Sequence, residues 1–167
     1  MRNISLLGVV ALLAISGCVS VNHVNFEAFT HPVNSNDIPL YYKPCKFYSY
    51  LQSDTEAGWV VKIKKKHSRY FLVKLPEECN LSKKNVWIKA GDVGVVVQNY
   101  DSIKIPLYKS ANTLSKPIKY IYSSSIGEIY DIKKKVVLLD IILDSGEVVH
   151  GWVEKKYLCG NPYTTCN

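Results

Sequence analysis

The residues of this sequence that could carry out covalent chemistry are its five cysteines and four histidines. A catalytic cysteine needs a histidine that accepts its proton. His150 and Cys159 are the nearest such pair in the sequence, and we expect no catalytic role for them because the cysteines are better explained as bridges. Glu77 and Glu78 follow Pro76 in a loop, where carboxylates are usually exposed. The sequence therefore predicts a protein that is not an enzyme.

No metal or cofactor site is expected either. His23, His31 and His67 are scattered and form no cluster with the spacing of metal ligands. No glycine-rich loop of the kind that binds phosphates is present. A zinc site made of four thiolates is the alternative use of the cysteines, but they lack the paired short spacings of such sites.

The first residues have the three parts of a secretory signal. Met1-Arg2-Asn3 is a short basic head, Ile4–Ile15 is an uncharged apolar run, and Ser16-Gly17 is a small-residue exit before Cys18. The apolar run is much shorter than the roughly 20 residues that cross a bilayer. We therefore expect residues 1–17 to be removed as a signal peptide.

The exit of this signal, Ile15-Ser16-Gly17-Cys18, resembles the bacterial lipobox. The resemblance implies that cleavage falls before Cys18, that its thiol receives a diacylglyceryl group, and that the new amino terminus receives a further acyl chain such as palmitate. Several chains on one residue anchor a protein stably in a membrane. Val19, rather than an aspartate, follows the cysteine, which resembles lipoproteins of the outer membrane that face the periplasm. The alternative is an ordinary secretory signal with a chance cysteine.

The mature chain is basic. Without Arg2, 20 basic residues stand against 14 acidic ones, a formal charge of +6. Such a surface favours anionic partners, for which lipid head groups, phosphorylated envelope polymers and acidic proteins are candidates. Nucleic acid fits the charge but not the compartment.

Lipidation of Cys18 would leave an even number of cysteines in an oxidising compartment, which favours disulfides. Of the three possible pairings we favour Cys45–Cys79 and Cys159–Cys166. Each of these bridges closes within one half of the chain. The loops would contribute about 4 and about 2.5 kcal/mol in the chain-entropy model.

Three landmarks recur along the chain at offsets of 67, 69 and 65 residues. The pairs are Ile38-Pro39-Leu40-Tyr41 with Ile105-Pro106-Leu107-Tyr108, Ile63-Lys64-Lys65-Lys66 with Ile132-Lys133-Lys134-Lys135, and Trp87 with Trp152. One duplicated unit explains all three. We therefore predict a tether over residues 18–36 and two domains, over 37–101 and 102–167.

Each unit has the sequence pattern of β-strands. Trp59, Val61 and Ile63 face one way while Lys62 and Lys64 face the other, which is typical of a half-buried strand. Turns at 67–68 and 144–147 predict hairpins. No stretch of the mature chain combines adequate length with a helical apolar repeat, so the fold class is all-β with little helix.

The end of the second copy, His150-Gly151-Trp152-Val153-Glu154-Lys155-Lys156-Tyr157-Leu158, resembles the end of the bacterial SH3 domain. In that family a Gly-Trp-Val strand is followed by a short 3₁₀-like turn and a further strand. The first copy carries a weaker version over residues 86–94. The resemblance implies two small SH3-like barrels in tandem, whose closed sheets suit units of about 60 residues.

Two sets of side chains are candidates for binding. The aromatic residues Tyr41, Trp87, Tyr108, Trp152 and Tyr157 either line a cleft for an extended ligand or fill the barrel interiors. The two lysine triplets either form solvated hairpin ends or an anion-binding ridge in each unit.

These observations predict a non-catalytic envelope lipoprotein that binds a cell-wall peptide or glycan, or an envelope protein, through tandem SH3-like modules. Two alternatives remain open. One is a periplasmic immunity lipoprotein that neutralises a delivered toxin, and the other is a structural component of an envelope assembly. The neighbouring genes would distinguish them.

Overall fold

The computed structural model describes residues 22–31, 37–52, 58–99 and 103–164. The described chain is all-β, and its single helical element is a 3₁₀ turn, η1 (Lys155–Tyr157). The strands are β1 (Asn22–Thr30), β2 (Asp37–Lys43), β3 (Lys46–Gln52), β4 (Val60–His67), β5 (Tyr70–Lys74), β6 (Asn85–Lys89), β7 (Val93–Val97), β8 (Ile105–Leu107), β9 (Lys119–Ile121), β10 (Ser125–Ile132), β11 (Val136–Ile142), β12 (Val148–Glu154) and β13 (Leu158–Cys159). The all-β fold class predicted from the sequence is confirmed.

The same order of strand pairing occurs twice, and every pair is antiparallel. In the first half, β1 pairs with β4, β4 with β5, β5 with β6, β6 with β2, and β2 with β3. In the second half, β7 pairs with β10, β10 with β11, β11 with β12, and β8 with β9, while one bridge joins β8's neighbour Tyr108 to Trp152 of β12. This correspondence is what a duplicated unit predicts.

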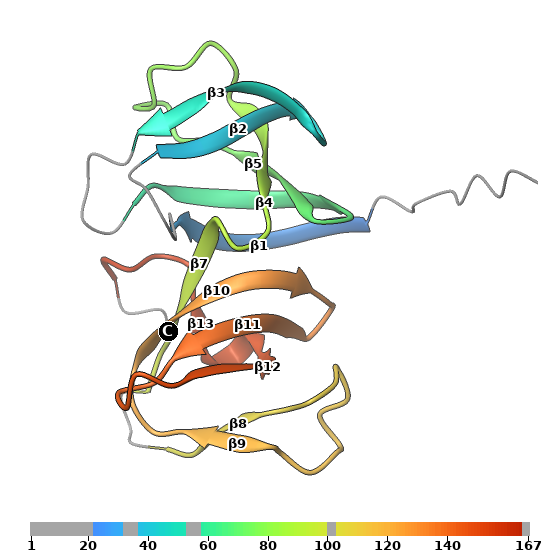
Figure 1. Cartoon of the computed structure of the whole chain (residues 1–167), viewed down its shortest axis with the longest axis vertical. Helices are drawn as coiled ribbons and strands as arrows, with labels where there is room; N and C mark the ends of the chain where they lie inside the picture. Colours follow the sequence, from blue (N-terminus) through green and yellow to red (C-terminus); the bar gives the residue numbers. More distant parts are fainter. Residues whose placement is uncertain (1–21, 32–36, 53–57, 100–102, 165–167) are drawn as a thin grey trace, which may run out of the picture.

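Strand β7 belongs to both halves. It pairs with β1 of the first half through Phe29 with Gly94, and with β10 and β13 of the second half. Figure 1 shows β7 running between the upper strands β1–β6 and the lower strands β8–β13. The described strands form an eleven-stranded sheet, with ten strands in one open path and β13 paired beside it with β7, and a separate β8–β9 pair, rather than closed rings. The predicted boundary at residues 101–102 falls just after this shared strand.

The buried side chains of the two halves are also continuous. Ala28 and Ile63 from the first half, Val93 and Val95 from β7, and Ile129 from the second half are all members of one apolar cluster. The run Val93-Gly94-Val95-Val96-Val97 is almost wholly apolar, which is typical of a strand covered on both faces. A central strand therefore ties the two halves into one core.

The prediction of a tether over residues 18–36 is wrong for residues 22–30. These residues form β1, which pairs along most of its length with β4 and ends in three buried residues, Ala28, Phe29 and Thr30. The Oγ1 of Thr30 accepts a hydrogen bond from the backbone N–H of Trp59 at 2.8 Å. Of the rest of the predicted tether, His31 donates a backbone hydrogen bond of 3.0 Å to the carbonyl of Asp92, and residues 18–21 and 32–36 lie outside the described residues, as does the signal segment.

The predicted hairpins are confirmed. The β4–β5 hairpin turns at Ser68, whose φ is +52°, and the β11–β12 hairpin turns at Gly146, whose φ is +78°. The 3₁₀ turn η1 follows β12 directly, as the resemblance to the bacterial SH3 domain implied. Among the described residues, no helix is long and apolar enough to cross a membrane.

Candidate functional site

The first half carries a group of aromatic rings that contact each other on the outside of β2, β3 and β5. The centroid of the Tyr41 ring lies 5.1 Å from that of Tyr70 and 6.4 Å from that of Phe47, both edge to face. Phe47 in turn lies 4.9 Å from Tyr50. We call these four residues, Tyr41, Phe47, Tyr50 and Tyr70, the aromatic surface.

The aromatic surface is open to solvent where it is furthest from the core. Phe47 is 51% exposed and Tyr50 is 57% exposed, whereas Leu40 and Leu51 on the same two strands are buried. Exposed aromatic side chains in contact with each other are favourable binding elements, because they offer a large apolar area at a low cost in side-chain entropy. This surface is therefore the part of the first half best suited to hold a ligand.

Two hydroxyl groups of this surface keep their protons at neutral pH. Burial raises the pKa of Tyr41, with Asp92, Cys45 and Tyr50 adding to the increase. A hydrogen bond with Cys45, followed by burial, raises the pKa of Tyr70. The Tyr41 hydroxyl can therefore donate a hydrogen bond to a ligand across the neutral range, whereas the Tyr70 hydroxyl already hydrogen-bonds Cys45.

Trp87, another of the candidate binding residues, lies directly beside Tyr41 in the first half. Tyr41 of β2 is opposite Trp87 of β6 in the strand register. The indole of Trp87 is half-buried and lies 6.2 Å from the imidazole of His67, edge to face. The structure thus brings Tyr41 and Trp87 together at one edge of the aromatic surface.

The corresponding residues of the second half are brought together as well, but they are covered. Tyr108 and Trp152 exchange two backbone hydrogen bonds of 2.9 and 2.8 Å, and the Tyr108 side chain is only 7% exposed. Burial raises the pKa of Tyr108, and Glu154 and Tyr157 add to the increase. Tyr157 itself is half-buried on η1, with the ammonium of Lys156 4.8 Å from its ring. The second half therefore contributes Tyr108 to its interior rather than to an open cleft.

Sequence reasoning missed Phe47, Tyr50 and Tyr70. The signal was present for two of them, because the stretch Tyr41–Tyr50 contains five aromatic residues in ten positions. Tyr70 joins them only through the pairing of β5 with β6 and of β6 with β2, which brings distant parts of the chain side by side. Only the three-dimensional arrangement shows that these rings form one surface.

The predicted bridge between Cys45 and Cys79 is absent. Neither residue is in a disulfide: Cys45 is exposed in the β2–β3 turn, where its φ is +63°, and Cys79 is buried in the loop after β5. Cys159 is disulfide-bonded. Its predicted partner Cys166 lies outside the described residues, so that pairing stays a prediction.

His150 is not paired with Cys159. Its Nδ1 contacts the carboxylate of Asp140 on the neighbouring strand, and its ring lies 6.1 Å from that of Tyr130. Burial, then the carboxylates of Glu128 and Asp140, raise the pKa of Tyr130 to about 12. His150 is exposed on β12, and no group of three or more potential metal ligands occurs within the described ranges.

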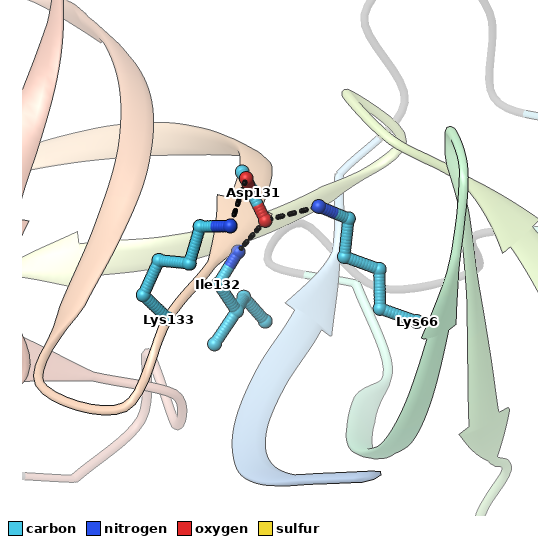
Figure 2. A network of polar contacts seen from close by, with 4 residues as sticks. All are labelled: Lys66, Asp131, Ile132 and Lys133. Atoms are coloured by element: carbon cyan, nitrogen blue, oxygen red, sulfur yellow. Dashed lines mark hydrogen bonds and ion pairs between the residues drawn. The ribbon is translucent and has the colours of Figure 1, made fainter. Parts of the chain in front are cut away.

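The two lysine triplets meet across the junction of the halves. The ammonium of Lys66, at the end of β4, contacts the carboxylate of Asp131, at the end of β10 (Figure 2). The same carboxylate accepts a hydrogen bond of 2.6 Å from the backbone N–H of Ile132, and the ammonium of Lys133 lies 3.7 Å from its other oxygen. Both Lys66 and Asp131 are mostly buried, so this network is part of the junction rather than a solvated hairpin end.

Comparison with known proteins assigns no family to the chain. No protein-family model matches it. No curated protein matches it either. The solved structure of NlpC2 from Trichomonas vaginalis is similar over 87% of this chain, with 11% sequence identity and a TM-score of 0.32. The chain covers 52% of that protein, and a likeness this weak carries no information about activity.

Proposed function

We propose that the chain is a non-catalytic envelope lipoprotein, anchored through Cys18, whose aromatic surface binds an extended polymer of the cell wall. The observation that carries the proposal is the contact between four aromatic rings on one outer face, two of them more than half exposed. Extended ligands lie against such faces on small β modules, where rings pack against the ligand and hydroxyls orient it.

The proposed architecture is a pair of SH3-like units that share β7. The order β7-β1-β4-β5-β6 in the first half corresponds to β13-β7-β10-β11-β12 in the second. The 3₁₀ turn η1 stands between the last two strands of the second half. This arrangement supports the resemblance that the tryptophan motifs suggested. The fold by itself says nothing about the ligand, so the aromatic surface carries the functional argument.

Binding to isolated cell-wall sacculi tests the proposal directly. The mature chain, residues 18–167 with Cys18→Ser, contains every described strand. We expect the double variant Phe47→Ala, Tyr50→Ala to bind about tenfold more weakly, because exposed aromatic anchors are typical hot spots. The matched control is Tyr122→Ala, Tyr163→Ala, which removes two rings that are each 60% exposed elsewhere. Equal retention of both variants would reject the aromatic surface as the binding site.

The anchor is tested separately by mass spectrometry of the mature amino terminus after expression of the full chain. We expect a triacylated Cys18 as the first residue and loss of the modification in Cys18→Ser. An unmodified terminus at any other residue would reject the lipoprotein assignment. Capture of one tightly bound envelope protein, with no retention on sacculi, would instead favour the immunity alternative.

A further inference from the structure

A basic cleft opens beside the first residues of β1. It has a volume of about 450 Å³ and lies between the start of β1, the β10–β11 turn and η1. Its lining residues are Asn22, His23, Val24, Asn25, Ile132, Lys133, Lys134 and Lys155. Three lysines, a histidine and two asparagine side chains are all able to donate hydrogen bonds, and none of the described residues that line the cleft carries a carboxylate. We call this feature the junction cleft, because both halves contribute to it.

Lys155 is the residue that most clearly needs an anionic partner. It is half-buried on η1, and its ammonium lies 5.3 Å from the centroid of the Phe26 ring. Burial lowers the pKa of this ammonium. Within the described part of the chain no carboxylate lies within ion-pair distance of Lys155. A partly desolvated cation without a counter-ion is costly, and an anion in the cleft would offset that cost.

Lys133 and Lys134 add charge that the protein does not neutralise. Both are exposed on the β10–β11 turn, and among the described residues the one carboxylate that forms an ion pair with Lys133 is that of Asp131, at 3.7 Å. That carboxylate is already in contact with Lys66, so two ammonium groups share one negative charge (Figure 2). The mouth of the cleft therefore keeps a net positive charge.

The junction cleft is also close to the proposed lipid. Asn22 lines the cleft and follows Cys18 by four residues. Four extended residues span at most about 14 Å. If Cys18 carries acyl chains inserted in a bilayer, the cleft must lie within about that distance of the head groups. This step rests on the proposed function.

We propose that the junction cleft binds the phosphate groups of anionic phospholipids in the membrane that holds the Cys18 anchor. Lys155 binds a head-group phosphate inside the cleft, and Lys133 and Lys134 contact neighbouring head groups at its mouth. The acyl chains hold the protein at the membrane, and the cleft fixes which end of the sheet faces it. The β10–β11 turn and the start of β1 therefore lie against the bilayer.

The first test measures lysine accessibility on the lipidated, full-length mature protein in vesicles. In phosphatidylcholine mixed with phosphatidylglycerol, we expect Lys133, Lys134 and Lys155 to be protected from acetylation. Exposed lysines that do not line the cleft, Lys62, Lys74 and Lys104, should react as they do in detergent. In phosphatidylcholine alone the protection should be lost. Equal reactivity of both groups in the anionic vesicles would overturn the proposal.

The second test removes the acyl chains, so that it does not depend on lipidation. The mature chain with Cys18→Ser should bind anionic vesicles and not neutral ones. Each lysine near an anionic surface is worth about a fivefold change in binding, so Lys133→Gln, Lys134→Gln, Lys155→Gln should weaken it by about a hundredfold. Lys62→Gln, Lys74→Gln, Lys104→Gln removes the same charge and should weaken it by much less.

The outcomes separate this proposal from the proposed function. Equal losses of vesicle binding in the two triple variants would mean that general charge attraction causes binding, and would overturn the junction cleft as the binding site. If inorganic phosphate stabilises the protein against unfolding but the protein does not bind vesicles, the proposal that the phosphate belongs to a membrane lipid is overturned. Phe47→Ala, Tyr50→Ala should bind vesicles normally. If that variant binds sacculi normally while the cleft variants lose vesicle binding, only the wall-binding assignment fails.

Discussion

The two halves of the molecule use the same Tyr-Trp pair in opposite ways. In the first half, Tyr41 beside Trp87 forms the edge of an open surface that continues to Phe47 and Tyr50. In the second half, Tyr108 beside Trp152 is 7% exposed. The pair itself is therefore a structural element of the scaffold. Binding depends on what surrounds it.

The surroundings differ in the hairpin that flanks the pair. The β2–β3 hairpin has two seven-residue strands that bring Phe47 and Tyr50 to the surface, whereas β8 and β9 have three residues each. Each tyrosine has both a carboxylate and another ring nearby, Asp92 and Tyr50 for Tyr41, and Glu154 and Tyr157 for Tyr108. The length of the neighbouring hairpin strands is therefore what separates the open surface from the covered pair.

The largest difference that we expect between the halves is in stability. Tyr108→Ala should lower the free energy of unfolding by about 3 kcal/mol, because it deletes a buried aromatic ring. Tyr41→Ala should cost about 1 kcal/mol, because much of its ring contacts other surface rings. Urea unfolding measures both, and sacculus binding should fall only for Tyr41→Ala. Similar stability losses with similar binding losses would contradict the division of roles.

The cysteines offer the next largest contrast. The bonded Cys159 in the second half should contribute about 2.5 kcal/mol if it closes the short loop to Cys166. Reduction should therefore lower the urea midpoint, and Cys159→Ser should remove that sensitivity. Cys45→Ser should leave the effect of reductant on the urea midpoint unchanged, because Cys45 is an exposed residue that forms no bridge. Peptide mapping without reductant identifies the partner of Cys159, and a peptide that links Cys159 to any residue other than Cys166 would contradict the pairing.

The smallest effect concerns the carboxylate of Asp92, which lies near Tyr41 in the first half. Burial raises the pKa of Asp92, an effect that Lys89 partly offsets and Glu128 reinforces. The folded state therefore holds the proton more tightly than the unfolded state, and the ionised carboxylate lowers stability once the pH exceeds the raised pKa. Asp92→Asn should stabilise the protein at pH 7 by about 0.5 kcal/mol or less.

The pH dependence provides the control for this change. The advantage of Asp92→Asn should disappear as the pH falls below the usual aspartate value of 3.8, where both states are protonated. Glu78→Gln, at an exposed loop residue, is the matched control for the removal of one negative charge. Thermal unfolding across this pH range measures both variants. A destabilised Asp92→Asn protein at pH 7 would mean that the carboxylate has a favourable partner.

Local patterns predicted much of the fold. The alternation Trp59-Val61-Ile63 predicted β4, the turn residues predicted two hairpins, and the recurring landmarks predicted that Tyr108 and Trp152 would repeat the places of Tyr41 and Trp87. These features depend on neighbours in the sequence or on comparison of the sequence with itself. They need no knowledge of which strands meet.

The errors came from long-range pairing. Val24, Phe26 and Ala28 alternate with polar residues, so a strand signal was present in β1. The alternation is short, however, and the surrounding polar residues resembled a tether. The missing bridge between Cys45, in the β2–β3 turn, and Cys79, in the loop after β5, is also a matter of segments that are distant in sequence. The aromatic surface and the junction cleft likewise combine strands that are distant in sequence, which no local pattern reports.

The sharing of β7 has a consequence for how the protein unfolds and how it can be divided. Because β7 is hydrogen-bonded to β1 on one side and to β10 on the other, melting either half removes a partner strand from the other half. The chain should therefore unfold in a single cooperative transition, and a cut at residues 101–102 should leave an unstable C-terminal fragment. A ligand bound to the first half would then protect the amide hydrogens of the second half from exchange with solvent, although it touches none of them.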